Sequence, residues 1–126
     1  MVGRLILLLT TTGRKTGLPR ATALQYEEKN DDIFLGSSRG LKADWVRNIL
    51  ADPQVEVQVK NRKFTGQAEV ISDPVRVADF LEMRLRNHPR MVGMIMRSEG
   101  LPERPSRTEL EEYAKNIALV IIRLGS

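Results

Sequence analysis

The chain has 126 residues, of which 41% are apolar and 29% charged, and this predicts a single globular domain over residues 1–126. Cysteine is absent and histidine occurs once, at His88, which excludes disulfides, thiolate nucleophiles and Cys/His zinc sites, so no metal site is expected. Redox chemistry would therefore need a bound cofactor. The lack of disulfides and of a signal-peptide pattern favours a cytoplasmic location. The apolar run 5–9 is too short for an integral membrane segment.

Positive charge is concentrated at the start of the chain. The net charge is +4, from 20 lysine and arginine residues against 16 acidic ones. The first 26 residues contain Arg4, Arg14, Lys15 and Arg20 and no acidic residue. This bias predicts an anionic partner such as a phosphate or a polyglutamate. A nucleic acid is not expected, because the chain has only six aromatic residues and no helix with a basic face.

Three strands are expected in the first 38 residues. Residues 4–12 are apolar and β-branched without alternation, which predicts a strand buried on both faces. Two glycines and a proline within residues 13–19 mark a turn, and a second strand follows over residues 20–28. The turn residues 30–32 precede a third strand over residues 33–38, whose small last residues allow close approach to the backbone.

Residues 42–71 change from a helical to a strand pattern. The spacing of apolar residues predicts a helix over residues 42–50, which ends before Pro53. Alternating valines predict a strand over residues 54–60, and a return strand follows over residues 64–71. These two strands are expected to pair antiparallel, because only a short reversal separates them.

Two helices and a closing strand are predicted after residue 71. Ser72 or Asp73 caps a helix that ends near Asn87, and Thr108 caps a short last helix. Residues 118–124 are β-branched enough to form a sixth strand. Six strands in a small chain favour an α+β fold, a six-stranded antiparallel split β-barrel with flanking helices, because closure removes exposed sheet edges.

Two loops offer the groups that bind an anion. Residues 13–20 place Arg14, Lys15 and Arg20 on a glycine-containing turn, where guanidinium forks, an ammonium and backbone amides suit a phosphate or carboxylate. The alternative is a solvated hairpin with ordinary surface charge. Residues 37–40 repeat this combination at a strand end, and the two loops are expected to converge on one ligand. The members of the second loop are Ser37, Ser38, Arg39 and Gly40.

Trp45 and Asn48 are three residues apart, which places them on one face of the predicted helix beside these loops. The alternative role for a single tryptophan is an anchor in the core. The methionines at residues 83, 91, 94 and 96 fit either an apolar pocket or core packing. No orienting partner for His88 is evident, and Tyr26 and Tyr113 are candidate proton donors, so the catalytic residue is unknown.

Several segments together resemble the deazaflavin-dependent nitroreductase family of split β-barrel oxidoreductases. The residues that carry the resemblance are LLLTTTGRKTGLPR, Ala23-Leu24, SSRG and DWVRNILADPQVEVQV, which cover about residues 5 to 70. Each segment alone is weak, and the combination is specific.

The resemblance implies an enzyme that binds coenzyme F420, whose tail carries a phosphate and glutamates, and transfers a hydride to quinones, nitroaromatics or similar acceptors. It implies cofactor contacts at ten residues. FMN in the same fold, or a noncatalytic carrier of a flavin, haem or lipid, remains the alternative, and a homodimer stays open. The ten residues are Arg14, Lys15, Thr16, Arg20, Ser37, Ser38, Arg39, Gly40, Trp45 and Asn48.

Overall fold

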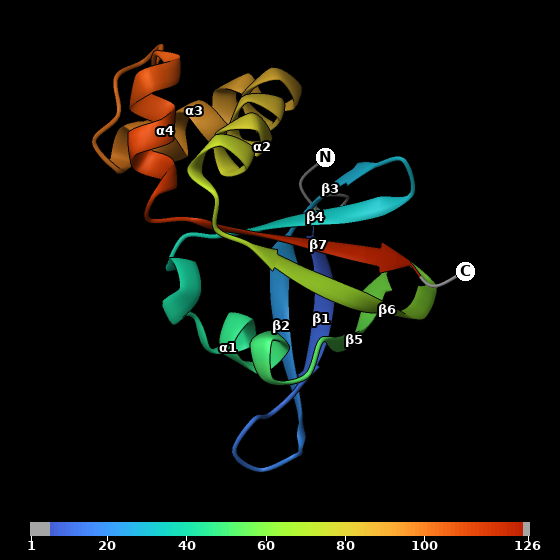
Figure 1. Cartoon of the computed structure of the whole chain (residues 1–126). Coiled ribbons are helices and arrows are strands. Elements are labelled where there is room, and N and C mark those ends of the chain that lie inside the picture. The colour runs from blue at the N-terminus through green and yellow to red at the C-terminus, as the bar shows by residue number, and fades with distance from the viewer. Residues whose placement is uncertain (1–5, 125–126) are drawn as a thin grey trace.

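The computed structural model describes residues 6–124, which form one antiparallel sheet with helices at two of its sides (Figure 1). The strand order is β2-β1-β5-β6-β7-β4-β3, and every neighbouring pair is antiparallel. The strands are β1 (Ile6–Thr12), β2 (Pro19–Gln25), β3 (Glu27–Lys29), β4 (Asp32–Ser37), β5 (Gln54–Val59), β6 (Arg62–Ile71) and β7 (Ala118–Leu124).

The sheet is curled, because its two outermost strands are consecutive in the chain. Only Tyr26 separates β2 from β3, yet β2 pairs with β1 and β3 pairs with β4 at the other end of the strand order. The predicted second strand over residues 20–28 therefore breaks at Tyr26, and the described residues form seven strands rather than six. The predicted split-barrel architecture is confirmed, and the extra strand comes from this corner.

The first strand differs from its prediction. Only one face of β1 is buried: Leu7, Leu9 and Thr11 point into the barrel, whereas Ile6 and Leu8 are 40% and 39% exposed. The expected burial on both faces is wrong, because β1 lies in the barrel wall between β2 and β5, where its side chains alternate between the core and the outer surface. Residues 4 and 5 of the predicted strand lie outside the described residues.

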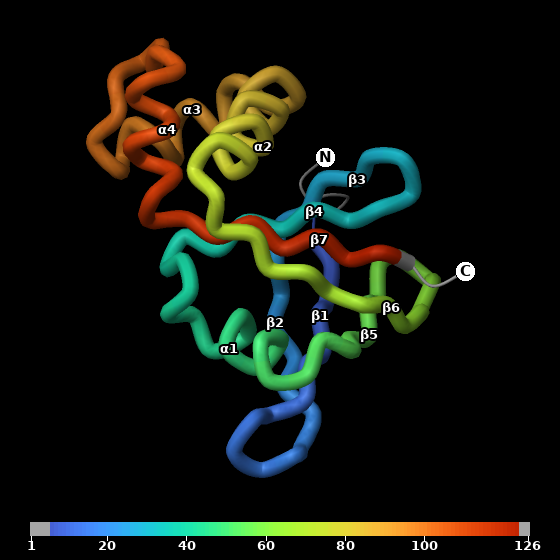
Figure 2. The backbone as a smooth tube through the Cα atoms, in the orientation of Figure 1, coloured from blue at the N-terminus to red at the C-terminus, as the bar shows by residue number. Residues whose placement is uncertain are grey.

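Two hydrophobic clusters share the closing strand. Val120 and Ile122 of β7 belong to the cluster inside the barrel, which includes Val57 of β5. Leu119 and Ile121 belong to the cluster beneath the helices. Since successive side chains of a strand point to opposite faces, β7 separates the barrel interior from the helical layer. Figure 2 shows that layer on one side of the sheet.

The helices confirm most of the predicted segments. The predicted helix over residues 42–50 is α1 (Asp44–Ala51), preceded by a 3-10 turn, η2 (Gly40–Lys42). Asp73 caps α2 (Pro74–Asn87) by accepting a hydrogen bond from the backbone N of Val75 at 3.3 Å. A further helix, α3 (Pro89–Ser98), occupies the methionine-rich segment in which none was predicted. Its side chains Val92 and Met96 pack into the second cluster.

Ser106, not Thr108, caps α4 (Arg107–Ala114). The Ser106 hydroxyl accepts from the backbone N of Glu109 at 3.2 Å, and the Glu109 carboxylate accepts from the backbone N of Ser106 at 2.8 Å. This reciprocal pair is a capping box. Thr108 follows the start of the helix, so the predicted cap was two residues late.

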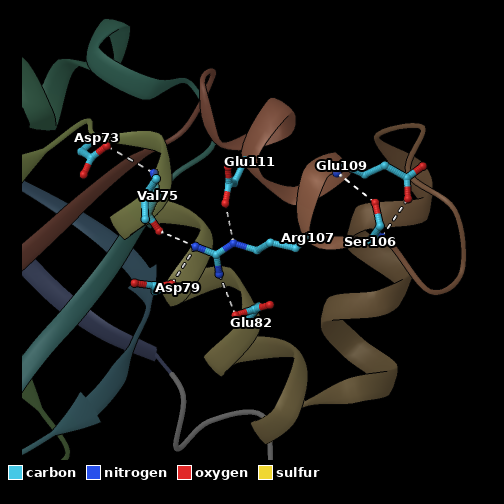
Figure 3. A network of polar contacts seen from close by, with 8 residues as sticks. All are labelled: Asp73, Val75, Asp79, Glu82, Ser106, Arg107, Glu109 and Glu111. Carbon is cyan, nitrogen blue, oxygen red and sulfur yellow. Dashed lines mark hydrogen bonds and ion pairs between the residues drawn. The ribbon is translucent and has the colours of Figure 1, made fainter.

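Arg107 joins α4 to α2 (Figure 3). Its guanidinium lies 2.7 Å from Glu111 and from Glu82, and 2.8 Å from Asp79. It also donates to the backbone carbonyl of Val75 at 3.0 Å. Hydrogen bonds to Glu111 and Asp79 raise the pKa of Arg107 above its usual value. Because arginine is already protonated at neutral pH, the raised pKa keeps Arg107 charged there.

The Arg107→Gln variant is expected to melt at a lower temperature than the wild type. The substitution leaves the carboxylates of Asp79, Glu82 and Glu111 close together without their common cation. Thermal unfolding followed by circular dichroism measures the difference, and Arg104→Gln is a matched control because no ion pair of Arg104 is seen in residues 6–124. Equal melting temperatures for the two variants would contradict the structural role of Arg107.

Glu27 of β3 ties the helical layer to the corner at Tyr26. Its side chain is 5% exposed, and its two carboxylate oxygens are shared by three side chains from the end of α2 and the residue after it. Arg84 Nε lies 3.4 Å and His88 Nε2 3.2 Å from Oε2, and Asn87 Nδ2 donates to Oε1 at 2.9 Å. His88 therefore has a carboxylate partner, which the sequence did not reveal.

Candidate functional site

Two backbone hydrogen bonds close the turn between β1 and β2. The backbone N of Gly13 donates to the carbonyl of Leu18, and that of Gly17 donates to the carbonyl of Gly13, both at 2.8 Å. Gly17 has φ +75°, a conformation that side chains disfavour. The Thr16 hydroxyl accepts from the backbone N of Leu18 at 3.2 Å. Thr16 therefore shapes the turn that presents its neighbours Arg14 and Lys15.

Asn48 of α1 fixes Arg14. Its Oδ1 accepts from the backbone N of Arg14 at 3.2 Å and from Arg14 Nη1 at 2.8 Å. Its Nδ2 donates to the Thr11 hydroxyl at 3.1 Å, and the side chain is almost completely buried. Asp44, in the first turn of α1, pairs with Arg14 Nη2 at 3.2 Å. Asn48 thus positions an arginine, because its polar atoms are engaged within the protein.

A cavity of about 380 Å³ opens between this turn and α1, and we call it the turn cavity. Its charged lining consists of Arg14, Lys15 and Arg20 against the single carboxylate of Asp44. Because Asp44 is already paired with Arg14, the cavity keeps two cations, Lys15 and Arg20, for a ligand. The whole lining is Gly13, Arg14, Lys15, Thr16, Arg20, Ala21, Thr22, Asp44, Trp45 and Asn48.

Six of the ten predicted cofactor residues thus lie around one cavity, and they come from the turn, the start of β2 and α1. Trp45 both lines the cavity and packs against the barrel core. Sequence reasoning missed Asp44, Ala21 and Thr22. An acidic residue in the first turn of a helix was the available signal for Asp44, whereas Ala21 and Thr22 carried none.

The second predicted loop lines a different cavity. Ser38, Arg39 and Gly40 lie around a cavity of about 470 Å³, which we call the loop cavity, together with Lys42, Ser72, Lys115 and Asn116. Ser37 lines neither cavity: it is 3% exposed, and its hydroxyl donates to the carbonyl of Gly40 at 2.8 Å. The structure therefore places the two loops on two cavities instead of one, and Ser37 holds its loop in shape.

The remaining candidates lie away from both cavities. Met96 is buried in the helical cluster, with Met83 and Met91 packed against it, so core packing accounts for these methionines. Burial raises the pKa of Tyr26, and the charge of Glu28 raises it further. Burial and Glu99 likewise raise the pKa of Tyr113. Neither tyrosine lines the turn cavity or the loop cavity, and no catalytic proton donor is assigned.

Residues 6–124 hold no group of three or more His, Asp or Glu side chains arranged to bind a metal ion. None of the helices described in this range has the length and apolar character required to cross a bilayer.

Comparisons with known proteins bear on the family and the fold of this chain. An F420H(2)-dependent quinone reductase of Mycobacterium tuberculosis is 39% identical over 68 residues, 52% of this chain and 46% of that protein. The chain thus spans about half the length of the curated relatives it matches.

Among solved structures, an F420-H2 dependent reductase superposes with a TM-score of 0.64 at 22% identity, covering 95% of each chain. The haem storage protein HutZ of Vibrio cholerae gives 0.66 at 14% identity, covering 98% of this chain and 83% of its own. These two likenesses confirm the split-barrel fold. The family model described as F420H(2)-dependent quinone reductase matches residues 1–100, which confirms the resemblance seen in the sequence, and the chain belongs to this family.

Proposed function

We propose that the protein is a reductase that binds reduced coenzyme F420 in the turn cavity and passes a hydride to a small quinone, nitroaromatic or similar acceptor. The observation that carries the proposal is the turn cavity itself, where three cations from the turn and the start of β2 face one carboxylate of α1. Such a donor set fits the phosphate and carboxylates of the F420 tail. A flavin-like ring would find an aromatic flank at Trp45.

In this proposal the side chains of the site bind the cofactor and orient it. Within residues 6–124 no ion pair of Lys15 or Arg20 is seen, and Arg14 presents a guanidinium whose direction Asn48 and Asp44 already fix. Preorganisation of this kind reduces the entropy lost on binding. When bound, the cofactor would supply the hydride, so no side chain is needed as a nucleophile. A proton from water completes the reduction of a quinone to its hydroquinone.

Fluorescence titration tests the cofactor, with F420 and FMN as separate ligands. We expect saturable binding of F420 and weaker binding of FMN, which has a single phosphate. Mixing the complex of reduced F420 with menadione should then restore the absorbance of oxidised F420. Binding without oxidation would leave a noncatalytic carrier, and preferential binding of FMN would replace F420 as the cofactor.

Four further expectations belong to this proposal. Residues 1–126 would act as a single domain that binds the cofactor, with a small-molecule acceptor as its partner. A homodimer is compatible with the fold, and one solved structure with a TM-score of 0.63 is described as a domain-swapped dimer. The cytoplasmic location stays a prediction. Analytical ultracentrifugation with and without F420 measures the oligomeric state.

A further inference from the structure

Asp44 places a carboxylate in a cavity whose other charged side chains are all cations. It lies in the first turn of α1, and the cations around the turn cavity are Arg14, Lys15 and Arg20. Asp44 Oδ1 lies 3.2 Å from Arg14 Nη2, and the Asp44 side chain is 83% exposed. A negative charge that solvent can reach therefore lies beside the groups that we assign to an anionic ligand.

Asn48, more than the Asp44 carboxylate, orients Arg14. Asn48 Oδ1 accepts from the backbone N and from Nη1 of Arg14, and the Asn48 side chain is almost completely buried. Arg14 Nη1 also donates to the backbone carbonyl of Asp44 at 3.4 Å, a contact that does not need the Asp44 side chain. An exposed ion pair adds little to stability. Removing the Asp44 carboxylate therefore changes the charge of the cavity more than the direction of Arg14.

The charge of a ligand decides how strongly Asp44 opposes its binding. An anion in contact with Arg14 lies close to the Asp44 carboxylate, because the two side chains are 3.2 Å apart. Repulsion between two charges grows in proportion to each of them. A phosphate monoester carries nearly two negative charges at neutral pH, whereas a phosphodiester carries one. The monoester therefore meets about twice the repulsion that the diester meets.

We propose that Asp44 is a specificity-determining residue, which disfavours doubly charged phosphates such as inorganic phosphate and the monoester FMN relative to singly charged phosphodiesters. This inference rests on the proposed function, because the phosphate of F420 joins the ring-bearing part to the rest of the tail and is therefore a diester. The three cations alone would attract the doubly charged anion more strongly. Asp44 reduces that advantage, so contacts with the rest of the ligand decide which molecule binds.

Titrations with inorganic phosphate and with dimethyl phosphate test this role without either cofactor. They are carried out above the second pKa of phosphate, where the first anion carries two charges and the second carries one. The fluorescence of Trp45 reports binding, because this single tryptophan lines the turn cavity. We expect Asp44→Asn to bind phosphate about tenfold and dimethyl phosphate about threefold more tightly than the wild type. A purely structural role for Asp44 predicts weaker binding of both anions.

Two matched variants separate the position of the charge from its removal. Asp31→Asn removes a carboxylate from the turn between β3 and β4, where φ +67° suits asparagine, and should bind both anions as the wild type does. Asp44→Glu keeps the carboxylate and should retain the wild-type preference. The inference is overturned if Asp44→Asn gains equally for both anions, gains for neither, or shows no saturable binding of phosphate.

Titration with the cofactors extends the test to the proposed function. The ratio of the Kd for FMN to the Kd for F420 should be about threefold smaller in Asp44→Asn than in the wild type, because the monoester gains more from the loss of the carboxylate. An unchanged ratio in a variant that binds both cofactors contradicts the role of Asp44. Failure of the wild type to bind F420 instead defeats the proposed function, and the two phosphate titrations still decide the role of Asp44.

Discussion

The double variant Arg14→Ala with Lys15→Ala is expected to bind F420 about 100-fold more weakly than the wild type. Hydrogen bonds to charged groups contribute about 1.5 to 3 kcal/mol each, and solvent screens the exposed Lys15, so we expect a combined loss of about 3 kcal/mol. Arg14 adds an indirect effect, because its contacts with Asn48 and Asp44 hold the turn against α1. Fluorescence titration measures the change in Kd.

The control for this variant removes the same charge elsewhere. Arg76→Ala with Arg86→Ala takes two exposed arginines from α2, away from the turn cavity, and should leave the Kd for F420 close to that of the wild type. A single Lys15→Ala variant isolates the cation from the turn-holding role of Arg14. If the Arg14 and Lys15 double variant binds as the wild type does, the turn cavity is not the cofactor site.

Replacing Glu27 with alanine is expected to lower the free energy of unfolding by about 3 kcal/mol, because breaking a buried ion pair leaves its partner without compensation. The substitution removes the carboxylate partner of Arg84, whose side chain is 15% exposed. It also removes the partner of Asn87 and His88. Urea denaturation followed by tryptophan fluorescence measures it, since Trp45 packs against the barrel core.

Glu28 provides the neighbouring control. Its side chain is exposed on the same short strand, so Glu28→Ala should change the free energy of unfolding by less than about 0.5 kcal/mol. The isosteric variant Glu27→Gln keeps the shape and loses the charge, and it should fall between the two. A Glu27→Ala variant as stable as Glu28→Ala would show that the carboxylate does not hold α2 to the sheet.

Periodic patterns predicted much of the fold. The alternation of valines along β5 and the cap at Asp73 were both confirmed, since each depends on residues close in sequence. Helix α3 was not predicted, because the apolar run at residues 91–96 fits a helix and a buried strand equally well. The corner at Tyr26 has no glycine or proline to mark it. The pairing of β3 with β4 reveals it only in three dimensions.

The site residues also divide into those that nearby sequence predicts and those that only the fold brings together. The turn carrying Arg14 and Lys15 was recognisable because glycines and cations lie within a few residues of one another. The separation of the two cavities was not, because Lys115 and Asn116 follow Arg39 by more than seventy residues and reach the loop cavity only through the fold. Charge counts along a sequence therefore indicate a kind of ligand, and tertiary structure decides which charges line the same cavity.

The position of β7 has a consequence for synthesis on the ribosome. The hairpins formed by β1 with β2 and by β5 with β6 can assemble early, since their partners are adjacent in the chain. The centre of the sheet must wait, because β7 inserts between β6 and β4 and emerges last of all the described strands. Nascent chains stalled before Ala118 should therefore remain sensitive to protease, and resistance should appear abruptly once this strand leaves the exit tunnel.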